Sequence, residues 1–530
     1  MRRLWSVIFF AAGALVAQSC SGSSDHGSNG AASSGAGGKQ ADGGPDSSGG
    51  SAGGASRAGS GGTAVAGEAG TSAEGGASGA VGSGAPLSLA WQLSYGQSYA
   101  AHVAVDSAGA AIVSDSMFDS ADVALGKLTV KSHGGADMML SRVLADGTPD
   151  WARAYGGTSD DYPVSFVLDG AGDIFMSGLY NGTGTLGGAS FPPFMGSAGR
   201  FDSSVAEFDA NGGLIWATTI NSNQEDFAGP GLAVSSAGDL FVPGSFLGTT
   251  SIGGLGHTAV GSWDGFIARY NHPNGSLQGA LTFGGSAEDR ASFALLTSTD
   301  LIVIGKFSGS VSFPTTPPTV LTSAGGSDVF IARLSLAGVM SGVVSFGGTS
   351  DEEIEGAALD SQGNLVLAGD FSSPILSILG GETLHGAGGM DFFLARLSPT
   401  LDHQWSVSFG SDADDAVRDL SLFPNGALAI TGEFRDHLAL GDKVWDATAG
   451  SDAGPTDIDY FVATLDSSGH PLWSYAAGGP GQERGLGVAA DASGALYVTA
   501  TFTSEIDFGS GQPLSAPAGQ FASALVRYAP

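Results

Sequence analysis

The sequence has little cysteine, few basic residues and no long apolar run. Cys20 is the only cysteine among 530 residues, so no disulfide forms within the chain and its stability must come from packing. Lys and Arg number 19 against 52 Asp and Glu, which gives a net charge of −33. Nucleic acid is bound through clusters of Lys and Arg, so this composition excludes a nucleic-acid partner.

Several motifs that carry chemistry are also absent. The histidines after His26 are scattered, without HxH or HExxH spacing, so no zinc or haem site is predicted. There is no EF-hand motif, no nucleophile elbow, and no Ser–His–Asp set that the sequence can assign. A glycoside hydrolase needs two carboxylates at a set separation, and this sequence has too many acids to select two.

The N-terminal segment has the pattern of an export signal. Arg2 and Arg3 precede an apolar run over residues 4–16, which is too short to span a bilayer. Small residues then precede Cys20, and this resembles the lipobox of bacterial lipoproteins, which implies lipidation of Cys20. The alternative is an ordinary secretory signal with an incidental cysteine. We expect a signal peptide over residues 1–19 and an exported lipoprotein anchored in the outer membrane or at the cell surface.

Residues 20–87 contain this cysteine and a low-complexity linker. The segment consists largely of Gly, Ser and Ala, with hardly an aromatic or branched side chain. Such a segment cannot bury enough apolar surface to offset the entropy of ordering its backbone. We therefore expect a flexible, disordered stalk between the anchor and a folded head.

A long-period repeat fills residues 88–530. Its marker is a strand that in most copies ends in an aromatic residue and glycine, and it begins at residues 91, 151, 216, 279, 342, 405 and 473. Each copy also contains a small-residue strand, a turn such as "DSQGN", an alternating strand such as "LVLAGDF" and a third strand such as "DFFLARLS". Four antiparallel strands in each of seven copies predict an all-β fold, a seven-bladed β-propeller.

The two ends of the repeat predict how the ring closes. The region begins with a marker strand, "LAWQLSYG", and ends with a third strand, "ASALVRYA". Pairing these two strands would complete the last blade and remove the exposed edges of an open array.

These motifs resemble the repeats of bacterial seven-bladed β-propeller proteins of the SBBP type. The resemblance rests on "GNLVLAGDF", on "DFFLARL" and on the marker strand followed by acids. With the lipobox and stalk, it implies a surface lipoprotein of myxobacteria-like bacteria. The resemblance is specific for the fold and weak for function. Copies three and four depart from the pattern, with Asn221 replacing the turn glycine and "LLTSTDLIVIGKF" lacking the usual turn, so these blades are expected to be less regular.

An acid recurs six residues after the marker-strand aromatic, usually behind a second acid. The first copy has Ala100 and Ala101 in this region instead. In a propeller this segment joins the outer strand of one blade to the inner strand of the next, so the acids are expected on one face. The acids of the six other copies are Asp160, Asp161, Glu225, Asp226, Glu288, Asp289, Asp351, Glu352, Asp414, Asp415 and Glu483.

Two interpretations of these acids remain open. The favoured one is structural: the carboxylates accept backbone N–H groups and pair with nearby arginines. The arginines available are Arg290, Arg418 and Arg484 beside the acids, and Arg142, Arg269, Arg333, Arg396 and Arg527 on the third strands. The other interpretation is calcium binding, because gathered acids repel one another unless they are protonated, paired or bound to metal. The sequence indicates no cofactor, or calcium alone.

A few residues stand outside the repeat. Glu353 is the one member of the triplet 351–353 that the repeat does not require. Packing between blades explains the marker-strand tryptophans, whereas Trp263 and Trp445 fall outside that register and are the candidates for sugar stacking. The loops 189–201 and 447–458 are the clearest asymmetries and are predicted to bind ligand.

The sequence favours a binding protein over an enzyme. The leading hypothesis is a monomeric cell-surface lipoprotein whose propeller head binds a surface protein or a glycan. The alternative is a hydrolase or lyase acting on extracellular polysaccharide at the mouth of the channel. A catalytic face would carry residues present in one blade only, whereas a scaffold would show nearly symmetric loops.

The calcium hypothesis leads to a direct test. If calcium holds the acidic steps between blades, a chelator should lower the melting temperature of the protein substantially, because the acids would then repel one another. Thermal unfolding followed by circular dichroism, with and without chelator, measures this effect, and an unchanged melting temperature would rule the hypothesis out.

Overall fold

The computed structural model describes residues 86–118, 123–125, 128–181, 185–186, 188–190, 201–447, 458–479 and 481–530. The signal peptide, Cys20 and the stalk up to residue 85 lie outside these residues. So does most of the two loops 189–201 and 447–458. Within the described part, no helix is long and apolar enough to cross a membrane.

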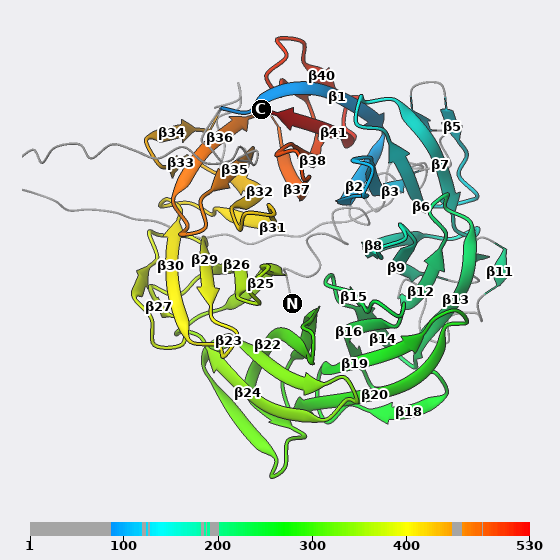
Figure 1. The fold of residues 1–530 in the computed structure, drawn as a ribbon, viewed down its shortest axis with the longest axis vertical. Coiled ribbons are helices and arrows are strands. Elements are labelled where there is room, and N and C mark those ends of the chain that lie inside the picture. Colours follow the sequence, from blue (N-terminus) through cyan, green and yellow to red (C-terminus); the bar gives the residue numbers. More distant parts are fainter. Residues whose placement is uncertain are drawn as a thin grey trace, which may run out of the picture. The chain divides into compact units, whose positions relative to one another are not determined.

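The described residues form an all-β propeller, in agreement with the predicted fold class. Its basic unit is a four-stranded antiparallel meander, and successive meanders follow one another around a ring (Figure 1). Three units are separate sheets of consecutive strands: β2 (Ser98–Val105), β3 (Ala111–Met117), β6 (Asp137–Val143) and β7 (Pro149–Tyr155); β25 (Glu352–Leu359), β26 (Leu365–Phe371), β29 (Asp391–Leu397) and β30 (His403–Phe409); β31 (Ala416–Leu422), β32 (Leu428–Phe434), β35 (Asp459–Leu465) and β36 (Pro471–Ala477).

A fourth separate sheet closes the ring, as predicted. It joins the last three strands of the chain to the first one, with Leu93 opposite Leu525. The strands of this sheet are β37 (Glu483–Ala490), β38 (Leu496–Phe502), β41 (Ala522–Ala529) and β1 (Ser88–Gly96).

A fifth sheet holds one meander and receives an additional hairpin. The outer strand β13 extends to Ser222 and pairs with β17 of the following copy. The strands of this sheet are β8 (Asp161–Leu168), β9 (Ile174–Tyr180), β12 (Asp202–Phe208), β13 (Leu214–Ser222), β17 (Thr249–Ile252) and β18 (Leu255–Thr258).

Copies three and four share one nine-stranded sheet, so the prediction of seven separate blades is wrong and five blades are separate sheets. The cause is the length of β22 and β23, which lets β22 reach back and pair with Gly284 and Gly285 of β20. The strands of this sheet are β14 (Glu225–Ala228), β15 (Ala233–Val234), β16 (Leu240–Leu247), β19 (Asp264–Asn271), β20 (Ser276–Gly285), β21 (Asp289–Leu296), β22 (Asp300–Phe313), β23 (Thr319–Ser335) and β24 (Met340–Phe346).

Copy three is irregular in a second way. Its first strand is divided into β14 and β15 around Gly229, Pro230 and Gly231. Pro230 has no N–H to donate to a neighbouring strand, and glycines weaken strand pairing. The departures in copies three and four therefore fall where the sequence predicted less regular blades.

Short hairpins connect the second and third strands of most units on the outside of the ring. Among the described residues they are β4 (Val123–Leu125) with β5 (Leu128–Val130), β10 (Thr185–Leu186) with β11 (Ala189–Ser190), β27 (Ile375–Ser377) with β28 (Thr383–His385), β33 (His437–Leu440) with β34 (Lys443–Asp446), and β39 (Glu505–Ile506) with β40 (Leu514–Ser515).

The first strand of each unit lies on the inner side of the ring and the marker strand on the outer side. Figure 1 shows β2, β8, β25, β31 and β37 toward the centre, and β7, β13, β24, β30 and β36 toward the periphery. Between neighbouring sheets the core is apolar: Val366 and Leu394 of one sheet share a buried cluster with Ile430 and Phe461 of the next. Burial of this kind supplies most of the stabilisation of a chain without disulfides.

The turns between first and second strands form as the sequence predicts. In the turn 360–364 the Asp360 carboxylate accepts the amides of Gln362 and Asn364 at 2.8 and 2.9 Å. Gly363 has a φ of 79°, a conformation that favours glycine. The same two bonds recur at Asp106, Asp169 and Asp491.

A glycine follows the last residue of the marker motif in most copies, because an aspartate of the same blade occupies the space of a side chain there. In β20, a Cβ on Gly284 would collide with the carboxylate of Asp264, the first residue of the third strand. The same overlap occurs at Gly156, Gly347, Gly410 and Gly478 with Asp137, Asp328, Asp391 and Asp459. The aspartate and the glycine are therefore a coupled pair, and the glycine makes room for a buried charge.

This coupling can be tested within one strand. We expect Gly284→Ala to destabilise the protein by about 1–3 kcal/mol, because overpacking forces the Asp264 side chain to move. Gly279 of the same strand is the matched control, since a Cβ there would meet nothing within 4 Å, and Gly279→Ala should change stability by less than about 1 kcal/mol. Urea titrations measure both values, and equal effects of the two variants would contradict the coupling.

Candidate functional site

The repeated acids lie at the steps between blades and bind the backbone of their own loop. The carboxylate accepts the amide of the residue four positions earlier: Gly157 to Asp161 at 2.7 Å, Gly285 to Asp289 at 2.7 Å, Gly348 to Glu352 at 2.7 Å, Ser411 to Asp415 at 2.6 Å and Gly479 to Glu483 at 3.1 Å. In copy three, Asp226 instead accepts the Ser203 amide at 2.8 Å. All six of these acids are buried.

The acids one position earlier tie each step to the preceding blade. Asp160, Asp351 and Asp414 accept the amides of Ala136, Ser327 and Met390 at 2.9–3.0 Å, each 24 residues upstream at the start of a third strand. Glu288 pairs with Arg290 at 2.6 Å, and Glu225 is buried. These contacts agree with the structural interpretation of the repeated acids.

Arg290 pairs with the repeated acid Glu288 as predicted, but the other arginines are placed differently. The third-strand arginines do not pair with the repeated acids but with acids at the first turn of their own blade: Arg142 with Asp106, Arg269 with Asp239, Arg333 with Asp300, Arg396 with Asp360 and Arg527 with Asp491. The reason is the direction of the third strand. The step between blades lies beside the first residue of this strand, whereas the arginine lies near its C-terminal end, beside the first turn of the blade. Arg418 and Arg484 pair with Glu433 at 2.6 and 3.2 Å.

Each step also holds a second buried acid that was not predicted as a site residue. It is the third-strand aspartate that fits against the marker glycine, as Asp264 does beside Asp289. Burial is the main cause that raises the pKa of Asp161, Asp289 and Glu352 to about 7, and the neighbouring third-strand aspartate raises it further. Among the described residues, no group of three or more His, Cys, Asp or Glu is placed to hold a metal ion, and the calcium hypothesis stays a prediction.

A group of charged residues, most of which do not follow the repeat, lies on the first and second strands of the later blades. We call it the charged arc. Glu353, the residue outside the repeat, pairs with Lys306 of the preceding blade at 2.9 Å. Glu355 and Asp370 both face the Arg418 guanidinium, at 3.9 and 4.0 Å. The charged arc consists of Glu288, Arg290, Lys306, Glu353, Glu355, Asp370, Arg418, Glu433 and Arg484.

The charged arc brings acids with opposite pKa shifts together. Burial raises the pKa of Glu355 to about 7 and also raises that of Asp370, and the two carboxylates repel each other. Glu433 is more deeply buried than Glu355, but Arg418 and Arg484 lower its pKa. One end of the arc therefore holds protons near neutral pH while the other holds a carboxylate paired with two guanidinium groups.

The earlier blades carry aromatic residues at a position where most of the later blades carry charges. The residue directly after the repeated acid is Tyr162 in β8 and Phe227 in β14, but Arg290 in β21, Glu353 in β25, Ala416 in β31 and Arg484 in β37. The aromatic arc consists of Tyr99, Tyr162 and Phe227, with Phe521, Phe201 and Trp263 packed on them at ring distances of 5.8, 5.6 and 5.1 Å.

The two tryptophans predicted to stack on sugars have different surroundings. Trp263 is buried between Phe227 and Arg290, whose guanidinium lies 4.3 Å from the ring centroid. It follows the repeat after all, because it directly precedes the third-strand aspartate. Trp445 is half-buried in the outer strand β34, where its indole N–H donates to Ser474 Oγ at 3.0 Å. Sugar stacking on either ring stays a prediction.

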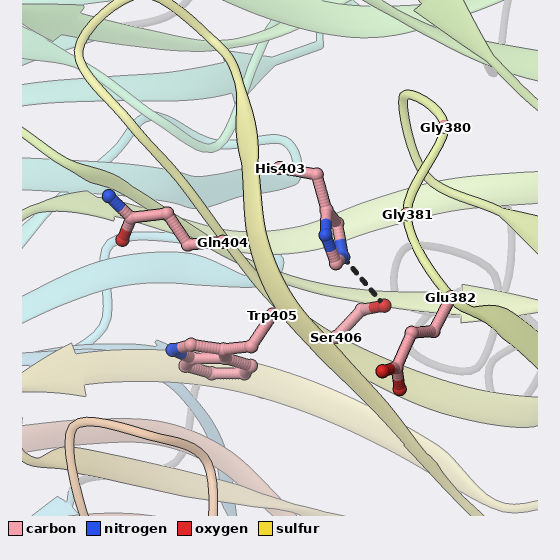
Figure 2. Close-up of a pocket in the computed structure, with 7 residues that line it drawn as sticks. All are labelled: Gly380, Gly381, Glu382, His403, Gln404, Trp405 and Ser406. Atoms are coloured by element: carbon pink, nitrogen blue, oxygen red, sulfur yellow. Dashed lines mark hydrogen bonds between the residues drawn. The ribbon is translucent and has the colours of Figure 1, made fainter.

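A hollow of about 440 Å³ lies on the outside of the ring beside β30. We call it the rim hollow, and its lining residues are Gly380, Gly381, Glu382, His403, Gln404, Trp405 and Ser406. Figure 2 shows His403 and Ser406 on one side of β30, toward Glu382 and the Gly380–Gly381 loop, and the Gln404 and Trp405 side chains on the other side of the strand. His403 Nε2 lies 3.0 Å from Ser406 Oγ. The sequence attributed Trp405 to blade packing alone, and the only sequence signal for the hollow is a histidine where the other copies have Leu, Pro or Met.

Comparison with known proteins gives limited similarity. No family model matches the chain. The chain is 27% identical over 316 residues to the regulatory protein FlaEY of Caulobacter vibrioides, a match that covers 56% of this chain and 33% of that protein. The chain thus spans about a third of the length of this relative.

Several solved structures have a loosely similar arrangement. A protein of unknown function from Bacteroides caccae has 13% identity and a TM-score of 0.34, covering 65% of this chain and 92% of that one. A europium-containing methanol dehydrogenase has 11% identity and a TM-score of 0.36, covering 84% and 93%. A puromycin hydrolase has 13% identity and a TM-score of 0.39, covering 79% and 53%. We draw no function from these similarities.

The buried acids predict how stability depends on pH. The pKa is about 7 for Asp161, Asp289 and Glu352 and about 6 for Asp415 in the folded protein, against about 4 in an unfolded chain. The folded state thus binds more protons than the unfolded state above pH 4. Their stabilising contribution is full below pH 4 and is lost as the pH rises through 6–7.

We therefore expect the free energy of unfolding, measured by urea titration, to fall by at least about 2 kcal/mol between pH 5 and pH 8. His102, whose pKa burial lowers to about 4, and His257, whose pKa burial also lowers, act in the opposite direction but are two groups against four. Asp289→Asn is the control, because a neutral amide there should make the pH dependence shallower. A stability that is constant or rises over this range would show that the acids are not protonated.

Proposed function

We propose that this protein is an exported, monomeric surface lipoprotein whose propeller head binds a protein or a glycan through the charged arc. Cys20 would carry the lipid anchor and residues up to 87 the stalk, as in the SBBP-type proteins that the sequence resembles. We also propose that the ring counts seven blades. The support is that the pairing order of four strands recurs twice within the nine-stranded sheet, in β14–β16–β19–β20 and in β21–β22–β23–β24.

The observation that supports binding is the break in the repeat at one position. Tyr162 and Phe227 stand where Glu353 and Arg484 stand in later blades. A position needed only for folding would hold similar residues in every copy. The aromatic arc is largely buried, whereas several acids of the charged arc are partly exposed. The partly exposed charged arc can select a ligand and its orientation through charge pairing.

The exposure within the charged arc indicates what a ligand would meet first. Glu288, Glu353 and Glu355 expose 20–30% of their side chains. Arg290, Lys306 and Arg484 expose only 7–12%. The basic groups thus hold the acids in place from within, and the accessible surface of the arc is acidic. This favours a ligand that presents ammonium groups or hydroxyl donors.

One observation favours the alternative function, a hydrolase or lyase acting on extracellular polysaccharide. Glu355 and Asp370 lie beside one guanidinium, with pKa values raised by burial, while that of Glu433 is lowered. Carboxyls with opposite shifts suit the roles of general acid and general base. In this case Asp370→Asn would abolish the degradation of polysaccharide.

Two variants test the proposal. We expect Cys20→Ser to move the protein from the membrane fraction to the soluble fraction, because the lipid attachment site is gone.

A screen of glycans and surface proteins, with and without calcium, identifies the ligand that binds best. We expect the double variant Glu353→Gln, Glu355→Gln to lower the affinity for this ligand at least tenfold. Glu505→Gln, a matched change on the outer strand β39, should bind like the wild type. If the Glu353→Gln, Glu355→Gln variant bound as tightly as the wild type, or if the wild type released sugar from a glycan, the binding proposal would be overturned.

A further inference from the structure

The blade of β25 and β26 carries an acid at three positions where the other blades carry different residues. Glu353 and Glu355 stand one and three residues after the repeated acid, and Asp370 stands directly before Phe371 of β26. At the same three positions the preceding blade has Arg290, Ser292 and Lys306, the following blade has Ala416, Arg418 and Glu433, and the blade of β37 has Arg484, Leu486 and Thr501. The other blades fold without these three acids, so the fold does not require them.

The strand register places the three acids together. Glu353 lies directly opposite Asp370 in the antiparallel pair of β25 and β26, and like charges in such a pair are destabilising. Glu355 is the extra residue of the bulge between Ile354 and Gly356, so no residue of β26 stands opposite it. Glu355 Oε1 and Asp370 Oδ2 lie 3.9 and 4.0 Å from the same nitrogen, Arg418 Nη1. Two carboxyls of adjacent strands therefore face one point.

The basic groups beside these acids do not neutralise them. Lys306 Nζ lies 2.9 Å from Glu353 Oε2 and pairs with that acid alone. Arg418 is bonded to Glu433 at 2.6 Å through Nη2, and its two Nη1 contacts with the other acids are longer than a hydrogen bond. Within the described residues, two carboxyls of this blade thus have no cation at hydrogen-bond distance.

The group is open to solvent at one end and buried at the other. The side chains of Glu355 and Glu353 are 26% and 20% exposed, whereas that of Asp370 is only 6% exposed. Asp370 Oδ1 accepts the amide of Val417 at 3.1 Å, and Oδ2 has no hydrogen bond among the described residues. A buried carboxylate oxygen without a hydrogen bond indicates that a partner is missing. A cation that reaches this oxygen must arrive on a slim chain.

We infer that Glu353, Glu355 and Asp370 bind the primary ammonium group of a lysine side chain that a partner protein presents. This inference rests on the proposed binding role of the charged arc and names its ligand. An ammonium group is compact and has three N–H donors, so it can give one charge-assisted hydrogen bond to each of the three acids. The unbranched stem of lysine carries the ammonium group past the exposed glutamates to Asp370, whereas the ring of an amino sugar would hold its amine outside.

The ionisation of these acids gives the binding a characteristic pH dependence. Burial and the neighbouring acids raise the pKa of Glu355 to about 7 and also raise that of Asp370. The charged groups around Glu355 are Glu353, Asp370, Lys306, Arg418 and Glu433. An ammonium group binds the ionised form of a carboxyl, and lysine keeps its own proton up to a pH of about 10. The affinity should therefore rise as the pH rises from 6 to 8.

A peptide with one lysine tests this inference on the full chain. The probe is acetyl-Gly-Lys-Gly-amide, titrated calorimetrically at low ionic strength, with the same peptide acetylated on its lysine and free glucosamine as comparison ligands. We expect Glu355→Gln and Asp370→Asn each to weaken binding of the lysine peptide at least fivefold, because each removes one charge-assisted bond. Glu505→Gln, which neutralises an exposed acid on β39, should bind like the wild type.

The melting temperatures separate a binding role from a structural one. Neither Glu355→Gln nor Asp370→Asn should lower the melting temperature, because each relieves repulsion between acids and the Asn oxygen can still accept the Val417 amide. The inference would be overturned if the wild type did not bind the peptide, if both variants bound it like the wild type, if the affinity stayed constant between pH 6 and pH 8, or if glucosamine bound more tightly than the peptide. A ligand from the screen that depends on Glu353 and Glu355 while the lysine peptide fails to bind would overturn this inference and leave the proposed function standing.

Discussion

The buried carboxylates at the steps between blades are the interaction on which the rest of the ring depends. The chain that leaves one blade and enters the next runs past a buried carboxylate, and its amide groups need partners there. Asp161, Asp289 and Glu352 each accept such an amide from their own loop, and their neighbours Asp160 and Asp351 accept one from the preceding blade. The glycines of the marker strand follow from the same constraint, because the third-strand aspartates need the space that a Cβ would fill. Folding thus uses these acids in six of the seven copies, and their abundance is no sign of a binding site.

This regular framework makes departures from it informative. The two arcs and the rim hollow are made of residues that change from blade to blade while the hydrogen bonds of the steps persist. Glu353 illustrates the difference: Asp351 and Glu352 bind backbone amides as their counterparts do, whereas Glu353 pairs with Lys306 of the neighbouring blade. In the rim hollow, His403 and Gly381 replace residues that only fill space elsewhere. Sites of this kind lower the stability of the fold little, because each is a local substitution on a strand that stays paired with its neighbouring strands.

Much of the architecture could be predicted from the repeat, and the errors have identifiable causes. The strands, the capped turns and the closure of the ring by β1 and β41 all follow from alternation, turn residues and the phase of the repeat. The prediction of seven separate sheets failed where β22 and β23 run past the blade and reach β20, since strand length beyond a turn is not encoded in the period. The partners of the third-strand arginines were wrong, because spacing along the chain does not reveal which end of a strand an arginine faces. Trp405 was assigned to packing, and its position beside the rim hollow depends on a hairpin 23 residues away in sequence.

The sequence by itself determined the β-class, the register of each strand and the positions where the chain must turn, because these depend on local alternation and on residues with special backbone preferences. Only the tertiary structure decided which carboxylates share a step and which acids the arginines pair with. It also decided where aromatic and charged side chains gather on the blades. It alone opened the rim hollow, which depends on one hairpin of β27 and β28 lacking the lysine that covers the next blade. The physical reason is that pairing between blades brings together residues far apart in the chain, and the chemistry of a site depends on those distances rather than on the order of the residues.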